Sequence, residues 1–223
     1  MNNASNKANR SKICRYFFVP QSPWSYLGHA RLVVLAKQHG VQIEVCPFDL
    51  GKVFSVSGGL PLSKRSPQRQ AYRLQELARW SEALQLPLNP QPKFFPVSGD
   101  AASKLIIATR LALGVDVALA LTGAIMRALW VEERNIGDEE TLVQIANSFE
   151  LDGKMLVKSS DTASVQAEYD RNTDDAIAAS VFGAPWSIVD GEGYWGQDRL
   201  DFVERKFLSL LPQAGEGLGM RAG

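Results

Sequence analysis

The chain has 223 residues, of which 45% are hydrophobic and 22% are charged, and its 24 basic side chains balance its 24 acidic ones. This composition is ordinary for a globular protein, and the lack of net charge and of a basic face argues against a nucleic-acid partner. No apolar run is long enough to span a bilayer, so we expect no membrane association. Residues 1–12 are polar and lack the hydrophobic segment of a signal peptide. We therefore expect a cytoplasmic protein with disordered tails at 1–12 and 213–223.

The first three predicted elements are a strand over 15–19, a helix over 24–39 and a strand over 42–48. The first strand is an apolar run, and the helix carries apolar residues at helical spacing. Between them, Ser22 is the predicted N-cap and Pro23 the first helical residue. The unpaired backbone N–H groups of such a terminus favour an anion beside the Ser22 hydroxyl. Ser-Pro is also a common helix start without any ligand, so this motif alone leaves both interpretations open.

A long, mostly helical block over 51–161 follows the second strand. Its predicted helices cover 67–84, 101–113 and 117–132, and a further one begins at 138–140. Another helix, over about 162–180, leads into two strands and a last helix. A chain that begins β-α-β and ends β-β-α is predicted to form one α/β domain from 13–50 and 162–212. The block over 51–161 is then an inserted all-helical subdomain.

Two motifs stand out in the last part of the chain. Phe182-Gly183-Ala184-Pro185 precedes a predicted strand over 186–189, and Trp195-Gly196-Gln197-Asp198-Arg199 leads into a predicted helix over 198–211. Pro185 is our candidate for a cis-proline at the start of the strand, and the alternative is an ordinary strand-initial proline after a glycine helix cap. Asp198 could bind an ammonium group, or it could be an ordinary acidic residue in the first turn of a helix.

Together, these motifs resemble the 2-hydroxychromene-2-carboxylate isomerases, which are glutathione-dependent members of the DsbA-like thioredoxin superfamily and relatives of kappa-class glutathione transferases. The family pattern Ser-Pro-aromatic-Ser-aromatic-Leu matches residues 22–27, where thioredoxin-like proteins carry Cys-X-X-Cys. The patterns Phe-Gly-X-Pro and Trp-Gly-X-Asp-Arg match 182–185 and 195–199. The resemblance covers about 15–211 and implies an α/β thioredoxin-like fold with an inserted all-helical subdomain, assembled as a homodimer.

The resemblance also implies which residues hold glutathione. Ser22 would contact the sulfur and act as the catalytic residue. The cysteinyl backbone would lie against the turn at Pro185, and the γ-glutamyl end would lie near Asp198. The implied glutathione-binding residues are Pro23, Trp24, Ala184, Pro185, Trp195, Gln197, Asp198 and Arg199.

The loop that would face the second substrate departs from the family pattern. Related proteins often carry an asparagine there, whereas this chain has none between Gly51 and Leu88. Lys64 and Arg65 are the nearest cations, and an aromatic substrate with a carboxylate gives a physical reason to consider them. A solvated loop is the alternative for such a charge run. Phe54 and Phe94 offer surface to a planar substrate, although aromatic side chains more often belong to a core; we predict all four as substrate-binding.

Other chemistries fit the sequence less well. Disulfide exchange needs a thiolate that Ser22 and Ser25 cannot supply, and Cys14 and Cys46 are expected to be buried in strands. A serine hydrolase needs a base beside its nucleophile, whereas His29 lies two helical turns from Ser22 and would at most line the pocket. No residues have the spacing of a zinc site or of a phosphate-binding loop, so we expect neither metal nor nucleotide.

We therefore predict a glutathione-dependent isomerase that interconverts 2-hydroxychromene-2-carboxylate and trans-o-hydroxybenzylidenepyruvate in bacterial aromatic degradation. Its expected ligands are glutathione and a small aromatic molecule. A kappa-like glutathione transferase, or another thiol-assisted isomerase with a different electrophile, is the first alternative. A non-catalytic glutathione- or peptide-binding protein is the second, and the Ser22 hydroxyl is the feature that distinguishes the enzymes from it.

Overall fold

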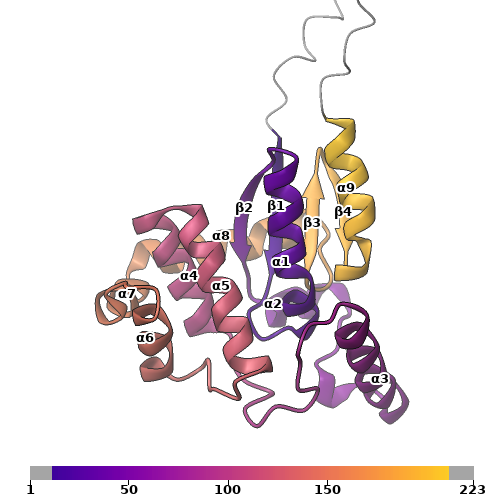
Figure 1. Cartoon of the computed structure of the whole chain (residues 1–223), viewed down its shortest axis with the longest axis horizontal. Helices are drawn as coiled ribbons and strands as arrows, with labels where there is room; N and C mark the ends of the chain where they lie inside the picture. Colours follow the sequence, from indigo (N-terminus) through magenta and orange to yellow (C-terminus); the bar gives the residue numbers. More distant parts are fainter. Residues whose placement is uncertain (1–11, 211–223) are drawn as a thin grey trace, which may run out of the picture.

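A computed structural model describes residues 12–210, and its four-stranded sheet lies between layers of helices (Figure 1). In spatial order, the strands are β2 (Gln42–Pro47), β1 (Ile13–Phe18), β3 (Trp186–Val189) and β4 (Glu192–Trp195). β1 runs parallel to β2 and antiparallel to β3, and β4 is antiparallel to β3. This is the β-α-β and β-β-α arrangement that the sequence predicts. Apart from Lys12, the tails predicted over 1–12 and 213–223 lie outside the described residues.

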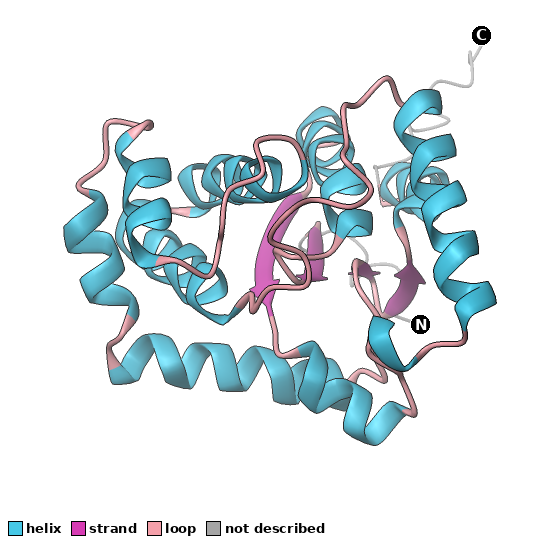
Figure 2. Ribbon diagram, turned by 90° about the horizontal axis from the view of Figure 1, so that it is seen from below, coloured by secondary structure: helices cyan, strands magenta, loops and turns pink. Residues whose placement is uncertain are grey.

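Alternation along β1 divides the core between the two faces of the sheet. Tyr16 and Phe18 belong to the cluster that includes α1 (Pro23–Gln38), which covers one face. Phe17 packs on the other face with residues of α2 (Leu50–Ser57) and α8 (Ala163–Ala178). All three aromatic side chains are fully buried, and the burial of each one stabilises the fold by roughly 1.5–3 kcal/mol. Figure 2 shows the strands enclosed by helices on both sides.

The block between β2 and α8 is helical, as expected. After α2 it contains a 3₁₀ turn, η1 (Leu62–Lys64), and then α3 (Pro67–Ala83), α4 (Asp100–Leu113), α5 (Val115–Trp130), α6 (Glu139–Asn147) and α7 (Gly153–Ser160). α4 packs against α5, and buried residues such as Leu105 and Ile125 join the same cluster as Tyr16. The insertion therefore shares one core with the sheet. In α3, only Leu77 is fully buried.

The C-terminal elements agree with the sequence except at the start of the last helix. Residues 197–199 form a 3₁₀ turn, η2 (Gln197–Arg199), and the α-helix α9 (Leu200–Ser209) begins after it. α9 buries Val203 and Phe207 on the α1 side of the sheet. The Ala184–Pro185 peptide bond is cis, as predicted for Pro185. None of the helices within residues 12–210 is long and apolar enough to cross a membrane.

Candidate active site

Ser22 forms the N-cap of α1, as the sequence predicts. Its backbone is extended, and its Oγ accepts a hydrogen bond from the Ser25 N–H at 3.2 Å. The Ser22 side chain is almost completely buried, and no acceptor for its hydroxyl proton is found among the described residues. The hydroxyl is therefore held in place by accepting one hydrogen bond and still has a proton to donate.

The start of α1 also leaves one backbone donor free. Pro23 has no N–H, the Ser25 N–H is bonded to Ser22 Oγ, and the Tyr26 N–H donates to the Ser22 carbonyl at 3.1 Å. The Trp24 N–H has no hydrogen-bond partner in the described part of the chain. A free N–H at the positive end of a 16-residue helix favours an anion beside it. Ser22 and Trp24 thus supply two donors at one helix terminus.

The turn before β3 is connected to the segment after β4. The Gly196 N–H donates to the Pro185 carbonyl at 2.9 Å, and Gly183 lies so close to the Trp195 indole that a Cβ would be 2.5 Å from Nε1. Ala184 is mostly buried, and its backbone N–H and carbonyl take part in no hydrogen bond within residues 12–210. An extended peptide could form hydrogen bonds with the free N–H and carbonyl of Ala184. The family resemblance of the sequence implies that the cysteinyl backbone of glutathione lies against this turn.

α1 also fixes the position of η2. Gly28 lies against Gln197, where a Cβ on residue 28 would come within 2.8 Å of the Gln197 Cβ. Arg31 donates to the Gln197 side-chain oxygen at 3.1 Å. The next two residues of η2 form an exposed ion pair, with 2.7 Å between Arg199 Nη1 and Asp198 Oδ2. The same helix therefore presents Ser22 and holds the segment that carries Asp198.

These elements border a cavity of about 390 Å³. Six of the eight predicted glutathione-binding residues line it: Trp24, Ala184, Trp195, Gln197, Asp198 and Arg199. The other two, Pro23 and Pro185, are buried and each is adjacent in the sequence to a lining residue, and Ser22 is buried two positions before Trp24. The structure therefore brings together residues that are separated by about 160 positions in the sequence.

One wall of this cavity comes from α3, which the sequence analysis did not assign to the site. Tyr72, Glu76 and Trp80 line it, at a spacing of four residues that places them on one face of the helix. This spacing is visible in the sequence, but it does not indicate whether the face lines a cavity or packs on the core. Leu77 and its neighbours face the core instead, so the polar and aromatic face next to them is free to line the cavity.

Only one of the four predicted substrate-binding residues lines this cavity. Arg65 does so from the loop before α3. Lys64 is exposed at the end of η1, and the Phe54 ring packs against Gly59. Phe94 packs on the main core, and the Lys93 ammonium lies 5.1 Å from its ring centroid. For Phe54, Lys64 and Phe94, substrate contact therefore stays a prediction without support from the cavity.

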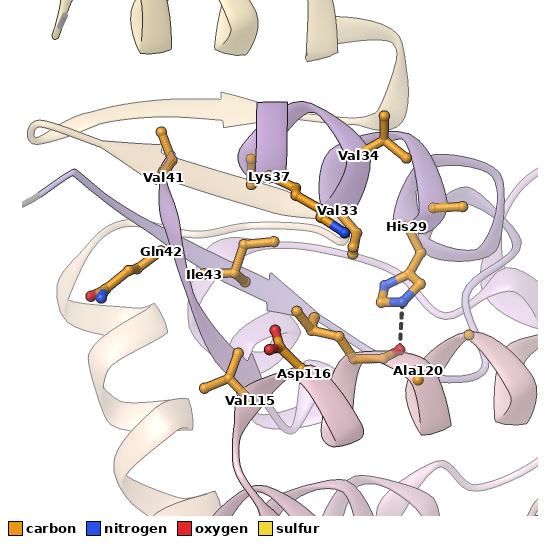
Figure 3. A pocket seen from close by; sticks show the side chains of 14 residues that line it. His29, Val33, Val34, Lys37, Val41, Gln42, Ile43, Val115, Asp116 and Ala120 are labelled. Atoms are coloured by element: carbon orange, nitrogen blue, oxygen red, sulfur yellow. Dashed lines mark hydrogen bonds between the residues drawn. The ribbon is translucent and has the colours of Figure 1, made fainter. Parts of the chain in front are cut away.

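A larger cavity of about 1060 Å³ lies elsewhere, between α1, α5 and β2 (Figure 3). Its walls are mainly aliphatic, and Lys37 and Asp116 reach into it from opposite sides. His29 lines this cavity rather than the one near Ser22. One ring nitrogen, Nε2, lies 2.9 Å from the Leu119 carbonyl, and the other has no partner in the described residues. His29 lies seven positions after Ser22, a rise of about 10 Å along α1, so His29 is too distant to act as a base for Ser22.

Burial of His29 predicts a loss of stability in mild acid. Desolvation lowers its pKa from 6.5 to about 4, against an opposing effect of the hydrogen bond to Leu119. Between these values the unfolded chain binds a proton that the folded chain does not, so the free energy of unfolding falls as the pH falls from 6.5 to 4. The expected loss is about 3 kcal/mol.

Denaturant unfolding of the parent and of His29→Gln across this range measures the effect. The variant should show a clearly flatter dependence of the free energy of unfolding on pH than the parent. Equal slopes in the parent and His29→Gln would show that His29 is not the titrating group.

The two cysteines are free and buried, as predicted. Burial raises the pKa of Cys14 to about 12 and also raises that of Cys46, so neither is a thiolate at neutral pH. Within residues 12–210, no group of three or more His, Cys, Asp or Glu side chains could hold a metal ion.

Comparison with known proteins places this chain and its fold in a family. Residues 15–207 match the DSBA-like thioredoxin domain. The chain is 31% identical to a 2-hydroxychromene-2-carboxylate isomerase of Sphingobium xenophagum over 199 residues, covering 89% of this chain and 99% of that protein. It is 28% identical to glutathione S-transferase kappa 2 of Caenorhabditis elegans, covering 88% and 93%.

A solved structure of a 2-hydroxychromene-2-carboxylate isomerase has a TM-score of 0.75 to this chain at 25% identity, covering 89% of this chain and 95% of the other. This agreement in sequence and structure extends over nearly all of the described residues. The chain therefore belongs to the DsbA-like thioredoxin domain family, and within that family it is similar to 2-hydroxychromene-2-carboxylate isomerases and kappa-class glutathione transferases.

Proposed function

We propose that this protein is a glutathione-dependent isomerase that interconverts 2-hydroxychromene-2-carboxylate and trans-o-hydroxybenzylidenepyruvate in aromatic degradation. The observation that carries the proposal is the start of α1, where the Ser22 hydroxyl and the Trp24 N–H are two free donors and Trp24 lines the cavity. Similarity to isomerases of that name over most of the chain supports the reaction. A homodimer in the cytoplasm remains a prediction.

The residues of the cavity fit glutathione. The free backbone groups of Ala184 suit its cysteinyl portion, and the Asp198 carboxylate suits its ammonium group. When bound, glutathione would supply a thiolate that adds to the conjugated double bond of the substrate, so that the resulting single bond can rotate before elimination of the thiolate restores the double bond. Ser22 and Trp24 would stabilise the negative charge of the sulfur by donating hydrogen bonds. Trp24 and Trp195 would cover the ligand and exclude water.

An absorbance assay of isomerisation, with and without reduced glutathione, tests this proposal. We expect interconversion only when glutathione is present, and a higher Tm at millimolar glutathione because the ligand binds the folded state. S-methylglutathione is the matched control: it should raise the Tm without supporting turnover. A Tm shift without isomerisation would favour the non-catalytic alternative, and a stable glutathione conjugate of a halogenated aromatic electrophile would favour a transferase. No Tm shift and no turnover would contradict all three.

Asp198→Ala should weaken glutathione binding more than it slows the bound-state reaction, because the proposed ammonium contact is remote from the sulfur. Asp198 is exposed, so we expect a Kd increase of about 2- to 5-fold, consistent with up to roughly 1 kcal/mol for an exposed ion pair. Calorimetric titration measures this change. Asp201→Ala is the control, since Asp201 also pairs with an arginine but does not line the cavity. Equal glutathione affinity in Asp198→Ala and the parent would remove Asp198 from the site.

A further inference from the structure

Arg65 is a cation in the cavity wall without an acidic partner. Of the other charged lining residues, Glu76 is paired with Arg79, and Asp198 with Arg199. Arg65 Nε donates to the Leu60 carbonyl at 2.9 Å, and no carboxylate lies within ion-pair distance of its guanidinium in the described residues. Its remaining N–H groups are available to an anion, and a guanidinium can bind a carboxylate through two hydrogen bonds.

Arg73 lies behind this wall, one and a half turns into α3, and also lacks a carboxylate partner. Its guanidinium is 5.0 Å from the ring centroid of Phe95 and 5.8 Å from that of Trp130. Its Nη2 is buried without a hydrogen-bond partner in the described residues. The aromatic faces compensate part of the cost of burying this charge, but they do not neutralise it.

The two arginines are close enough to interact. Burial, and then the charge of Arg65, lower the pKa of Arg73 to about 10, so it remains charged at neutral pH. Arg73 does not line the cavity, so Arg65 is the group that an anionic ligand would contact, and the charge of Arg73 adds to the positive potential at Arg65. Trp24, Tyr72, Trp80 and Trp195 supply the aromatic walls of the same cavity, as a planar aryl group requires.

We propose that Arg65 binds the carboxylate of a conjugated aryl electrophile in this cavity and that Arg73 is a positioning residue that strengthens this interaction through its charge. This inference rests on the proposed function, and it names the binding group for the second substrate. The aryl ring lies among the aromatic side chains of α3 and α1, and the carboxylate lies at Arg65. Arg73 makes no contact with the substrate.

Ligand binding to the full-length protein without glutathione tests this assignment separately from isomerase activity. The two probes are trans-benzylidenepyruvate and benzylideneacetone, conjugated aryl ketones that differ in the carboxylate. Quenching of tryptophan fluorescence reports binding, since Trp24, Trp80 and Trp195 line the cavity. We expect Arg65→Gln to weaken benzylidenepyruvate binding about 10-fold and to change benzylideneacetone binding less than 2-fold.

Arg73→Gln should weaken benzylidenepyruvate binding about 3-fold, and Arg73→Lys should restore most of that loss because it retains the charge. If the role of Arg73 were purely structural, Arg73→Lys would not restore binding, and the effect would not depend on the carboxylate of the probe. Arg205→Gln is the matched control: Arg205 also lies over an aromatic ring, that of Phe202, but on α9 outside the cavity. It should leave both affinities unchanged.

Equal losses for the two probes in Arg65→Gln would overturn the proposal. The proposal would also be overturned if Arg65→Gln lost affinity for glutathione but not for benzylidenepyruvate. Arg65 would then bind a carboxylate of glutathione. If Arg73→Gln does not fold, Arg73→Lys and the Arg65 variant still decide the outcome. Failure of isomerisation with intact, carboxylate-dependent probe binding would contradict the proposed reaction and leave the anion site standing.

Discussion

Ser22→Ala is expected to lower turnover near neutral pH by roughly 10²- to 10³-fold, as does the loss of one preorganised donor to an anion in other enzymes. The Ser22 hydroxyl is positioned by the Ser25 N–H and has its proton free to donate. An ordinary thiol has a pKa of about 8.5, and lowering it by two units takes about 2.7 kcal/mol of preferential thiolate stabilisation. Removing the hydroxyl should therefore raise the pKa of bound glutathione, and higher pH should recover part of the lost activity.

Thiolate absorbance of bound glutathione against pH, measured beside turnover, checks this prediction. Loss of the N-cap should also cost about 1 kcal/mol of stability, so the fold of the variant must be verified by its Tm. Ser25→Ala is the neighbouring control, because the Ser25 hydroxyl is fully buried within the helix. An unchanged thiolate pKa in Ser22→Ala, or a larger effect in Ser25→Ala, would assign the sulfur contact to another group.

Gly28→Ala is expected to destabilise the protein and to weaken glutathione binding, although alanine is the better helix former. The helix-propensity gain is at most about 1 kcal/mol, whereas overpacking a tight contact costs about 1–3 kcal/mol. The steric term dominates because the new methyl would meet the Gln197 Cβ at 2.8 Å and its Cα at 3.4 Å, which cannot move without the backbone of η2. Displacement of η2 would also move Asp198 and Arg199 at the cavity wall.

Gly123→Ala provides a matched control within α5. A Cβ at residue 123 would meet only the His29 ring, at 3.4 Å, which is an ordinary contact. That variant should be as stable as the parent or more stable, and its glutathione affinity should not change. Denaturant unfolding and calorimetric titration of both variants measure the contrast. Equal stability of Gly28→Ala and Gly123→Ala would show that α1 and η2 can separate without cost.

The start of α1 and the turn at Pro185 could be predicted from the sequence because local patterns determine both. Ser22 and Pro23 mark a helix start, and Pro185 marks the entry to a strand. These signals do not depend on long-range packing. The α3 wall could not be predicted in this way. Helical spacing shows that Tyr72 and Trp80 share a face, but the path of the preceding loop decides which way that face points.

The surroundings of Phe94 could not be predicted from local patterns either. An aromatic residue in a proline-rich loop has no periodicity that indicates whether it faces a ligand or the core. In the structure, the ring centroids of the neighbouring Phe95 and of Trp130 are 5.0 Å apart, and Phe94 packs on the same core. Long-range packing against α5, which no local pattern encodes, decides the position of this loop.

The two sides of the cavity differ in how firmly the fold holds them. Gln197 is packed against α1 and is almost completely buried, whereas α3 buries a single side chain fully and leaves Tyr72 more than half exposed. Substitutions at exposed positions usually change stability by less than about 0.5 kcal/mol, so this helix can accumulate changes with little cost to folding. The fold therefore fixes the α1–η2 side of the cavity and leaves the α3 side adaptable, and residue 72 is the natural starting point for a library that seeks new ligands, whereas Trp80 also packs on the core.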